Sequence, residues 1–401
     1  MKDDASRDWD RWGPLAARYR PERPRRILAL DGGGIRGLIT LEVLRRLETE
    51  LATATGAGET FRLCDFFDLV GGTSTGAIIA AGLARGMSVE EISKFYQAFG
   101  RKVFVRRKPW ELWQSLYGDG PLALTLKDKF GANTNLEPQN LKCLLVVVTR
   151  NTTTDSAWPV SSNPFAKYND PHRADCNLRI PLWKLVRAST AAPVYFPPEV
   201  VSLDPDNPNK TFVFVDGGTT PYNNPAFLLF RMATAPAYRL EWKTGERRLL
   251  IVSVGTGSAP VPGSTPQDPD VNLASAALNT LSALMSQASV DQDVNCRVIG
   301  RCTYGGVIDR ELRDLLPVEP GLSELAVPLD RDMGRAFLYV RYDADLTPEG
   351  LKQLGLARIN ARRVQKMDAA GNMADLQAIG KALASKVDLS DLAGFVKTVK
   401  A

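Results

Sequence analysis

Hydrophobic residues along this chain gather in short runs that are separated by stretches of mixed polarity. Nearly continuous apolar runs occupy residues 26–30, 66–70, 211–215 and 249–254. Such runs are typical of strands in a sheet that is buried on both faces. Between the first two runs, Leu44, Leu47 and Leu51 repeat at helical spacing. We therefore expect an α/β fold whose central sheet is covered by helices on both faces.

These patterns divide the chain into three parts. Residues 1–24 form a charged, proline-containing arm, and residues 258–270 are rich in proline and serine, as in a loop or linker. Beyond this linker, the pattern predicts one strand at residues 337–342 and a helical tail. One apolar face of the tail is formed by Met373, Leu376, Ile379 and Leu383. We expect the arm to be followed by a main domain at 25–260 and a mainly helical C-terminal extension at 261–401, packed on that domain.

The composition is that of a globular protein with a sizeable core. Hydrophobic residues make up 44% and charged residues 24% of the 401 residues. The formal charge of +5 is too small to indicate a nucleic-acid polymer as partner. No apolar stretch reaches the ~18 residues that span a bilayer, and the first residues lack the apolar segment of a secretory signal. We therefore expect a cytoplasmic protein.

The cysteine and histidine content argues against a metal site. Five cysteines are scattered without a C-x-x-C pair, as in reduced cytoplasmic proteins. The one histidine, His172, lies in a loop-like segment and is expected at the surface. We therefore expect neither a metal nor a cofactor.

The first candidate for chemistry is a glycine-rich turn after the strand at 26–30. Residues 31–37 have the sequence D-G-G-G-I-R-G. The glycines leave backbone amides uncovered near a helix N-terminus, where a phosphate or an oxyanion is favoured. The spacing of Gly32, Gly34 and Gly37 also satisfies the dinucleotide-binding pattern G-x-G-x-x-G, so this turn alone leaves both interpretations open.

The second candidate is Ser74, in the motif G-T-S-T-G at residues 72–76. The motif follows an apolar segment and precedes a helix-like one, which is the context of a nucleophile elbow. Gly72 and Gly76 make room for the strained turn that exposes the serine hydroxyl. The motif therefore predicts that Ser74 is a nucleophile.

The third candidate is Asp216, which follows the strand at 211–215 and precedes Gly217 and Gly218. A serine hydroxyl needs a base, and the usual base is a histidine. Because no motif surrounds His172, we expect a carboxylate to take the serine proton directly. An aspartate has an ordinary pKa of ~3.9, so such a base has to be partly desolvated.

Together these motifs resemble those of the patatin-like phospholipases. The resemblance rests on residues 31–37, 72–76, 188–198 (A-S-T-A-A-P-V-Y-F-P-P), 216–218 and Asn223-Asn224-Pro225. It covers residues 25–260 and implies a three-layer α/β hydrolase with a mostly parallel central sheet. The activity implied is phospholipase A-type hydrolysis of fatty acyl esters in membrane phospholipids, through an acyl-enzyme intermediate and without a metal.

The resemblance also implies a role for each matching residue. Ser74 corresponds to the nucleophile and Asp216 to its base. The amides around Gly32, Gly33 and Gly34 correspond to the oxyanion hole, and Arg36 stands where the family places an arginine near that hole.

A second resemblance concerns regulation. Residues 308–311 and 339–342 are similar to a bacterial branch that includes cyclic-nucleotide-activated effector phospholipases of anti-phage defence. It implies a cyclic dinucleotide activator and a part in antiviral defence. Candidates for phosphate contacts are Arg301, Arg310 and Arg341.

Other functions stay open at this point. A nicotinamide-dependent oxidoreductase would need an acidic residue at the end of the second strand, where Ser74 stands instead. A non-catalytic lipid-binding or scaffold protein would not require Ser74 and Asp216, which are both present. Protease activity is compatible with the same pair of residues.

A basic segment at residues 101–113 (RKVFVRRKPWELW) raises the question of membrane docking. Its five cations precede Trp110 and Trp113, a combination that suits anionic headgroups and the membrane interface. A solvated loop with two core tryptophans explains the segment equally well. We expect a protein that acts peripherally at phospholipid membranes, and a homo-oligomer stays open.

Overall fold

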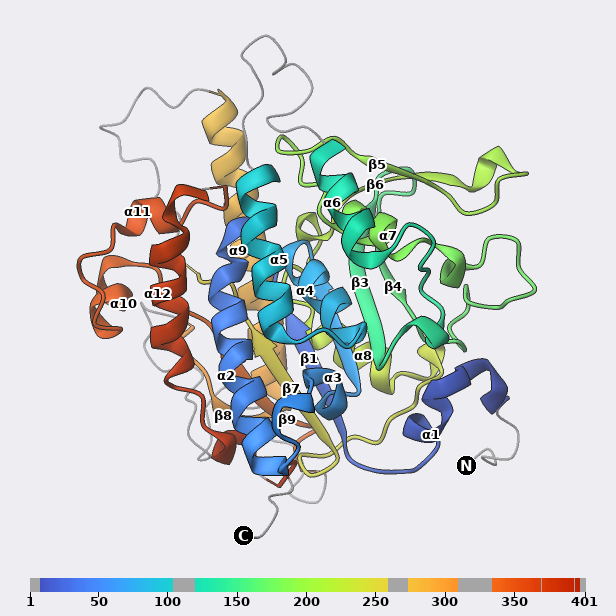
Figure 1. The fold of residues 1–401 in the computed structure, drawn as a ribbon, viewed down its shortest axis with the longest axis horizontal. Coiled ribbons are helices and arrows are strands. Elements are labelled where there is room, and N and C mark those ends of the chain that lie inside the picture. The colour runs from blue at the N-terminus through green and yellow to red at the C-terminus, as the bar shows by residue number, and fades with distance from the viewer. Residues whose placement is uncertain are drawn as a thin grey trace.

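The computed structural model describes residues 8–103, 120–258, 273–308, 334–368, 370–392 and 394–396. Within these ranges, nine strands form one mixed sheet that is flanked by helices (Figure 1). The strands are β1 (Arg25–Leu30), β2 (Leu69–Thr73), β3 (Leu144–Asn151), β4 (Ser156–Ser161), β5 (Glu199–Ser202), β6 (Thr211–Asp216), β7 (Leu249–Val254), β8 (Arg301–Tyr304) and β9 (Leu338–Tyr342). The helices are α1 (Ala16–Tyr19), α2 (Gly37–Thr55), α3 (Leu63–Phe66), α4 (Thr75–Ala84), α5 (Val89–Val103), α6 (Gly120–Phe130), α7 (Leu182–Ser189), α8 (Ala226–Thr234), α9 (Leu273–Ile299), α10 (Pro348–Gln353), α11 (Ala361–Val364) and α12 (Met373–Ala384).

The sheet is mostly parallel, as the resemblance implies. Its strand order is β5-β6-β3-β2-β1-β7-β9-β8, and β4 pairs with β3. All pairs from β3 to β8 along this order are parallel, whereas β4, β5 and β6 join antiparallel. Because β1 and β2 are parallel neighbours, the loop after β1 and Ser74 after β2 lie at the same edge of the sheet. Carboxyl ends of parallel strands are where α/β proteins place their sites.

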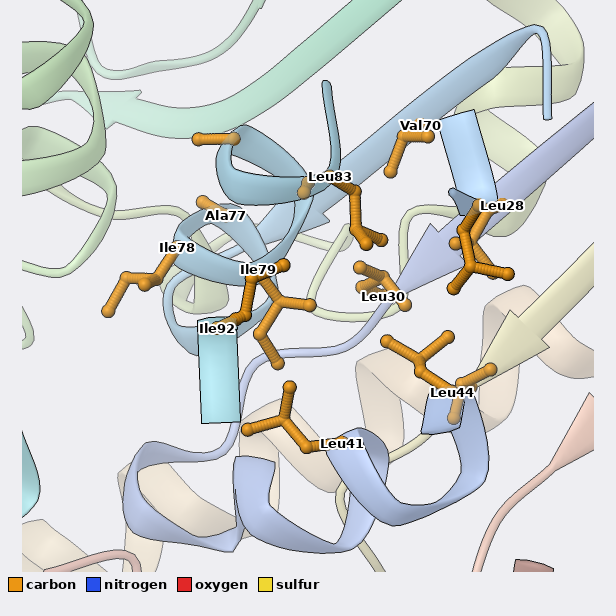
Figure 2. Close-up of a cluster of buried hydrophobic side chains, with 14 of the residues drawn as sticks. Leu28, Leu30, Leu41, Leu44, Val70, Ala77, Ile78, Ile79, Leu83 and Ile92 are labelled. Carbon is orange, nitrogen blue, oxygen red and sulfur yellow. The ribbon is translucent and has the colours of Figure 1, made fainter. Parts of the chain in front are cut away.

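Strand β1 shows why helices are needed on both faces of the sheet. Successive side chains of a strand point to opposite faces. Leu28 and Leu30 accordingly belong to one core cluster, shared with α2, α4, α5 and α12. Ile27 and Ala29 belong to a second cluster, shared with α8, α9 and the N-terminal arm. Figure 2 shows part of the first cluster, and Figure 1 shows α2, α4 and α5 in front of the strands, so the three-layer architecture is confirmed.

Helix α4 directly follows Ser74 and is enclosed on all sides. All ten of its residues are buried, including its one polar residue, Thr75. A helix that is apolar all round is typical of a position inside the core. The backbone after Ser74 is therefore held firmly by packing.

One strand begins later than the apolar pattern predicts. The run at 66–70 suggests a strand from Phe66, but α3 ends at Phe66 and β2 begins at Leu69. The Asp65 carboxylate accepts a hydrogen bond of 2.8 Å from the Arg62 amide, which caps this short helical turn. Strand β2 instead extends through Gly71, where a Cβ atom would lie 2.6 Å from the Leu229 side chain of α8. A strand pattern does not favour glycine, so the apolar run also missed the continuation of β2 beyond Val70.

The C-terminal extension contributes strands as well as helices. The strand predicted at 337–342 is β9, which pairs with β7, and the unpredicted β8 pairs with β9. The predicted apolar face of the tail lies on α12, where Leu376 and Ile379 are fully buried. This face packs in the same cluster as α2. The boundary at residue 260 stays a prediction.

The N-terminal arm is more structured than its charge suggests. A 3-10 segment at Trp9–Leu15 and the short α1 bury Trp12, Leu15 and Tyr19 in the second core cluster. The Tyr19 hydroxyl donates to the carbonyl of Asp68 and accepts from the amide of Leu144 at 2.8 Å. Trp12, Leu15 and Tyr19 are spaced three and four residues apart, which is the helical spacing that indicates this packing. The many charged residues around them made this spacing hard to recognise.

Candidate functional site

Ser74 occupies a sharp turn between β2 and α4. Its backbone has φ 53° and ψ −119°, a conformation that costs energy for any residue with a side chain. Close backbone contacts explain the flanking glycines. A Cβ on Gly72 would lie 2.1 Å from the carbonyl oxygen of Gly76, and a Cβ on Gly76 would lie 2.2 Å from that of Leu30. Only glycine fits at either position, so the motif G-x-S-x-G follows from the geometry of the turn.

Asp216 ends β6 and faces Ser74 across the edge of the sheet. The Ser74 hydroxyl donates a hydrogen bond of 2.5 Å to Asp216 Oδ2. The amide of Gly218 donates to Asp216 Oδ1 at 2.7 Å and so fixes the carboxylate. A Cβ on Gly217 would lie 2.3 Å from the carbonyl oxygen of Val148, which explains the first glycine of D-G-G. The structure thus brings the two residues that the motifs single out into direct contact.

Burial changes the acidity of Asp216. Its side chain is 2% exposed, and desolvation raises its pKa to about 6, although the bonds from Ser74 and Gly218 and the charge of Arg187 act in the opposite direction. A carboxylate of this pKa is a stronger base than an ordinary aspartate and is still mostly ionised at pH 7. The environment therefore suits proton transfer from a hydroxyl.

The glycine-rich loop after β1 is fixed through its carbonyl groups. The Thr256 hydroxyl donates to the Gly32 carbonyl at 2.9 Å. Arg36 Nε donates to that of Gly33 at 3.4 Å, and the Thr75 hydroxyl to that of Gly34 at 2.8 Å. In a trans peptide the N–H points away from the carbonyl. These three contacts therefore set the directions of the amides that follow.

Two amides of this loop remain for a ligand. The Gly32 amide donates to the Asn223 carbonyl at 3.1 Å, and the Ile35 amide to the Met367 carbonyl at 2.8 Å. Among the described residues, none accepts a hydrogen bond from the amides of Gly33 or Gly34. The Gly32 amide is thus already bonded within the protein, which leaves those of Gly33 and Gly34 as the candidates, and the oxyanion hole itself stays a prediction.

Arg36 lies beside this loop, with its guanidinium against the Gly33 carbonyl. Burial lowers its pKa, while Asp343, Tyr195 and Asp31 act in the opposite direction. The cation polarises the peptide whose N–H belongs to Gly34 and thereby strengthens it as a donor. In this structure, Arg36 therefore contacts the loop through the carbonyl group of Gly33.

A buried ion pair under the loop was not predicted from the sequence. Arg341 of β9 donates to both oxygens of Asp31, at 2.8 and 2.7 Å, and both side chains are 4% exposed. Arg341 also donates to the Ser253 hydroxyl and to Asp343. Burial raises the pKa of Asp31 to about 6 even though Arg341 lowers it. A charged residue within an apolar strand pattern was the one available signal for this pair.

These contacts correct the expectation for the phosphate-binding arginines. Arg341 is buried and its hydrogen bonds are used within the protein, so it does not face a ligand. Arg301 is exposed and lies 3.5 Å from Glu246. Arg310 lies outside the described residues.

Ser189 is a further unpredicted contact of the elbow. Its hydroxyl accepts a hydrogen bond of 2.9 Å from the Ser74 amide and donates one of 2.6 Å to the Val148 carbonyl. It therefore links the strained turn to β3. Its place within the block at 188–198 was the signal that could have identified it.

A largely apolar cavity opens at Ser74. Its empty volume is about 550 Å³, counting the part open to solvent. The lining residues are Gly34, Ser74, Thr75, Ile78, Tyr96, Leu122, Thr190, Ala192, Tyr195, Phe196, Asp216, Met285 and Met367. Met285 and Met367 come from the C-terminal extension, so that part of the chain helps to form the cavity. A narrow apolar cavity beside a reactive hydroxyl can hold a hydrocarbon chain.

The remaining candidates lie away from this site. His172 is exposed, as expected. Residues 104–113 of the basic segment lie outside the described residues, and 101–103 end α5. Within the described part of the chain, no three His, Cys, Asp or Glu side chains are arranged to hold a metal ion. None of the helices described has the length and apolar character needed to cross a bilayer.

Comparisons with known proteins point to one family. Residues 28–230 match the family model described as Patatin-like phospholipase. The chain is 32% identical over 223 residues to a cGAMP-activated phospholipase of Vibrio cholerae, covering 51% of this chain and 56% of that protein. A cGAMP-activated phospholipase of Escherichia coli is 29% identical over 250 residues, with 59% and 63% covered. Patatin-17 of Solanum cardiophyllum is 28% identical over 248 residues, with 58% and 60% covered. The matches thus span less than two thirds of each relative.

Proposed function

The chain belongs to the patatin-like phospholipase family, and from this premise we propose that it hydrolyses fatty acyl esters of phospholipids through Ser74 and Asp216. The observation that carries the proposal is the 2.5 Å hydrogen bond from the Ser74 hydroxyl to a buried carboxylate. The chain's one histidine is exposed elsewhere, so Asp216 is the base that this geometry supplies.

The first half of the reaction forms an acyl-enzyme. Ser74 Oγ attacks the ester carbonyl carbon while Asp216 takes the hydroxyl proton. The carbonyl oxygen becomes an oxyanion, which the amides of Gly33 and Gly34 stabilise with hydrogen bonds. The C–O bond to the glycerol then breaks, and Asp216 returns the proton to the departing alcohol.

The second half regenerates the enzyme. A water molecule attacks the acyl carbon of the ester on Ser74, and Asp216 accepts a proton from that water. The tetrahedral intermediate collapses, the Ser74 oxygen leaves and recovers the proton, and the fatty acid departs. The same two amides serve both tetrahedral intermediates.

The cavity and the relatives support the choice of substrate. Its apolar lining, including Ile78, Leu122 and Phe196, suits one acyl chain beside Ser74. A phospholipid substrate requires contact with a membrane surface, so we propose peripheral action from the cytoplasm. The relatives from Vibrio cholerae and Escherichia coli, named as cGAMP-activated phospholipases, support activation by a cyclic dinucleotide. A role in antiviral defence is proposed from the sequence resemblance alone.

The experiment that tests the hydrolase combines labelling and turnover. A fluorophosphonate probe is expected to label Ser74, and purified protein is expected to release fatty acid from phospholipid vesicles, with and without cGAMP. Neutral lipid esters and a peptide panel define the substrate class. If Ser74 stays unlabelled in folded protein and no ester is cleaved under either condition, a non-catalytic lipid-binding role replaces the hydrolase.

A further inference from the structure

A second pocket lies at the opposite end of the sheet from Ser74. It is bounded by the N-terminal arm and by residues 240–248, which precede β7. Arg25 and Leu249 are paired at the starts of the parallel strands β1 and β7. The pocket is thus at the amino ends of strands whose carboxyl ends carry the proposed site. Its empty volume is about 720 Å³, counting the part open to solvent.

Aromatic rings form much of the wall of this pocket. The rings are those of Trp9, Trp12, Tyr19 and Trp242. Trp12 and Tyr19 stack with centroids 4.7 Å apart, and the planes of Tyr19 and Trp242 differ by only 11°. Trp12 is 1% and Tyr19 is 6% exposed, so packing holds both rings in place. The faces of these two rings are covered by their neighbours, and Arg25 lies over the rings of Tyr19 and Trp242. The partly exposed Trp9 and Trp242 are therefore the rings that remain for stacking against a flat ring of a ligand.

The charged residues of the pocket have an excess of cations. Its lining contains Arg20, Arg23, Arg25, Lys243 and Arg248 against the two carboxylates Glu22 and Glu241. Arg23 and Arg25 bind the buried Asp68, which lies outside the lining. Lys243 and Arg248 share Glu22, at 2.6 and 3.6 Å, and both are more than half exposed. An anionic ligand can therefore compete for these cations at the surface.

We propose that this pocket binds a nucleotide, whose base stacks on the partly exposed Trp9 or Trp242 and whose phosphate meets Arg20, Lys243 and Arg248. Phosphate favours arginine, and the base explains why cations and rings share one cavity. The buried rings argue against insertion into a membrane, which needs protruding aromatic side chains. The proposal rests on the proposed cyclic-dinucleotide activation only for the choice of the main probe.

The position of the pocket gives a bound nucleotide access to both halves of the proposed site. Strand β1 begins at Arg25 and leads into the loop with Gly33 and Gly34. Asp68, the partner of Arg23 and Arg25, immediately precedes β2, which leads to Ser74. A phosphate held by Arg20, Lys243 and Arg248 adds negative charge beside these arginines and so changes the charge balance at the starts of both strands.

The test measures binding to the purified full chain by calorimetry, so it does not depend on ester hydrolysis. The probes are cGAMP, AMP, adenosine, pyrophosphate and phosphatidylglycerol vesicles. One variant replaces Arg20, Lys243 and Arg248 by Gln. Its matched control replaces Arg46, Lys94 and Arg150 by Gln, which removes the same charge at exposed positions elsewhere. A third variant is Trp242→Leu.

The proposal expects saturable binding of cGAMP or AMP that weakens by roughly tenfold or more in the pocket variant and by less than about twofold in the control. Trp242→Leu is expected to weaken AMP and to spare pyrophosphate. The proposal is overturned if the parent binds no nucleotide, if the control weakens binding as much as the pocket variant, or if the pocket variant loses only vesicle binding. Nucleotide binding without any ester hydrolysis would remove the hydrolase and leave this site.

Discussion

At the residue scale, the contact between Ser74 and Asp216 is bounded by glycines that have no room for a side chain. If Gly72, Gly76 or Gly217 carried a Cβ atom, that atom would lie 2.1 to 2.3 Å from a backbone carbonyl oxygen. Such close approaches leave the backbone around the hydroxyl and the carboxylate little room to shift, and the Ser189 hydroxyl also binds the Ser74 amide. Catalytic groups that act as one unit lose function together when either is removed.

Ser74→Ala and Asp216→Ala are therefore each expected to abolish nearly all ester hydrolysis. The double variant is expected to be no worse than either single one, because the two groups serve the same proton transfer. His172→Ala, at an exposed position, serves as the control and should stay within a few fold of the parent rate. Steady-state kinetics on a soluble ester provides the measurement. A folded His172→Ala protein without turnover would contradict the role of Asp216.

The pH dependence follows from the raised pKa of Asp216. The base has to be ionised, so kcat/KM is expected to rise with pH with a midpoint near the pKa of about 6. Asp31 titrates in the same range, since its pKa is also about 6. A pH profile of the Asp31→Asn variant separates the two. If Asp216 causes the rise of kcat/KM near pH 6, the rise stays in the Asp31→Asn variant. If Asp31 causes it, the rise disappears.

The same pKa predicts a gain in stability when the charge is removed. Between the ordinary pKa of 3.8 and about 6, the folded state holds more protons than the unfolded chain, so rising pH costs stability across that window. At pH 7 the cost is at most on the order of 3 kcal/mol. Asp216→Asn is therefore expected to melt at a higher temperature than the parent at pH 7, with the difference shrinking below pH 4. An equal difference at both pH values would refute the buried charge as its cause.

At the element scale, β9 connects the late part of the chain to the proposed site. Its Arg341 binds Asp31, the residue from which the glycine-rich loop starts. The Met367 carbonyl binds the Ile35 amide on the other side of that loop. The loop is thus held by two segments of the extension as well as by Thr256.

Arg341→Met is expected to destabilise the protein by about 3–5 kcal/mol, because it leaves the Asp31 carboxylate buried without a partner. The matched control is Arg301→Met on the neighbouring β8, where the pair with Glu246 is exposed and the effect should be within about 0.5 kcal/mol. Denaturant unfolding measures both. If the two substitutions lowered the free energy of unfolding equally, the buried pair would stabilise the protein no more than the exposed pair.

Periodicity was sufficient for the elements that are apolar and regular. Strands such as β7 are continuous apolar runs, and α12 repeats at helical spacing, so both were predicted from local pattern. The start of β2 was wrong because Phe66, the first residue of the apolar run, ends the short helix α3, and Gly71, required by α8 packing, hid the continuation of the strand. For the proposed site, motifs singled out Ser74 and Asp216, since their neighbours have to be glycine, and the structure brings the two into contact. Their catalytic roles stay a prediction.

Contacts between segments that are distant in the sequence could not be predicted from local patterns. Arg341 meets Asp31 only because β9 joins the sheet beside β7, and no local pattern encodes that neighbour. The Gly32 amide is occupied by Asn223, which likewise lies far along the chain. Tertiary pairing of polar groups therefore accounts for what the sequence did not predict.

At the scale of the whole molecule, the extension is part of the core. Leu376 and Ile379 are fully buried in the cluster that contains β1 and α2, and Met367 lines the cavity. A chain that ends at residue 345 lacks all three. Removing this part exposes apolar surface of α2 and frees one side of the glycine-rich loop.

Truncation after residue 345 is accordingly expected to abolish cooperative thermal unfolding and fluorophosphonate labelling of Ser74. Leu376→Ala, a milder change, is expected to cost about 2–5 kcal/mol. Lys381→Ala at an exposed position of α12 is the control. A truncated protein that melts cooperatively and hydrolyses a soluble ester at the parent rate would make the extension dispensable.

The attachment of the glycine-rich loop has a consequence for the order of synthesis. Ser74 and Asp216 leave the ribosome long before Arg341 and Met367, which hold the loop beside them. A nascent chain thus carries the proposed nucleophile and base while the amides proposed to bind the oxyanion are still unsupported. We infer that lipid cleavage begins only once the C-terminal segments have emerged and docked, so translation itself delays the chemistry until the polypeptide is nearly finished.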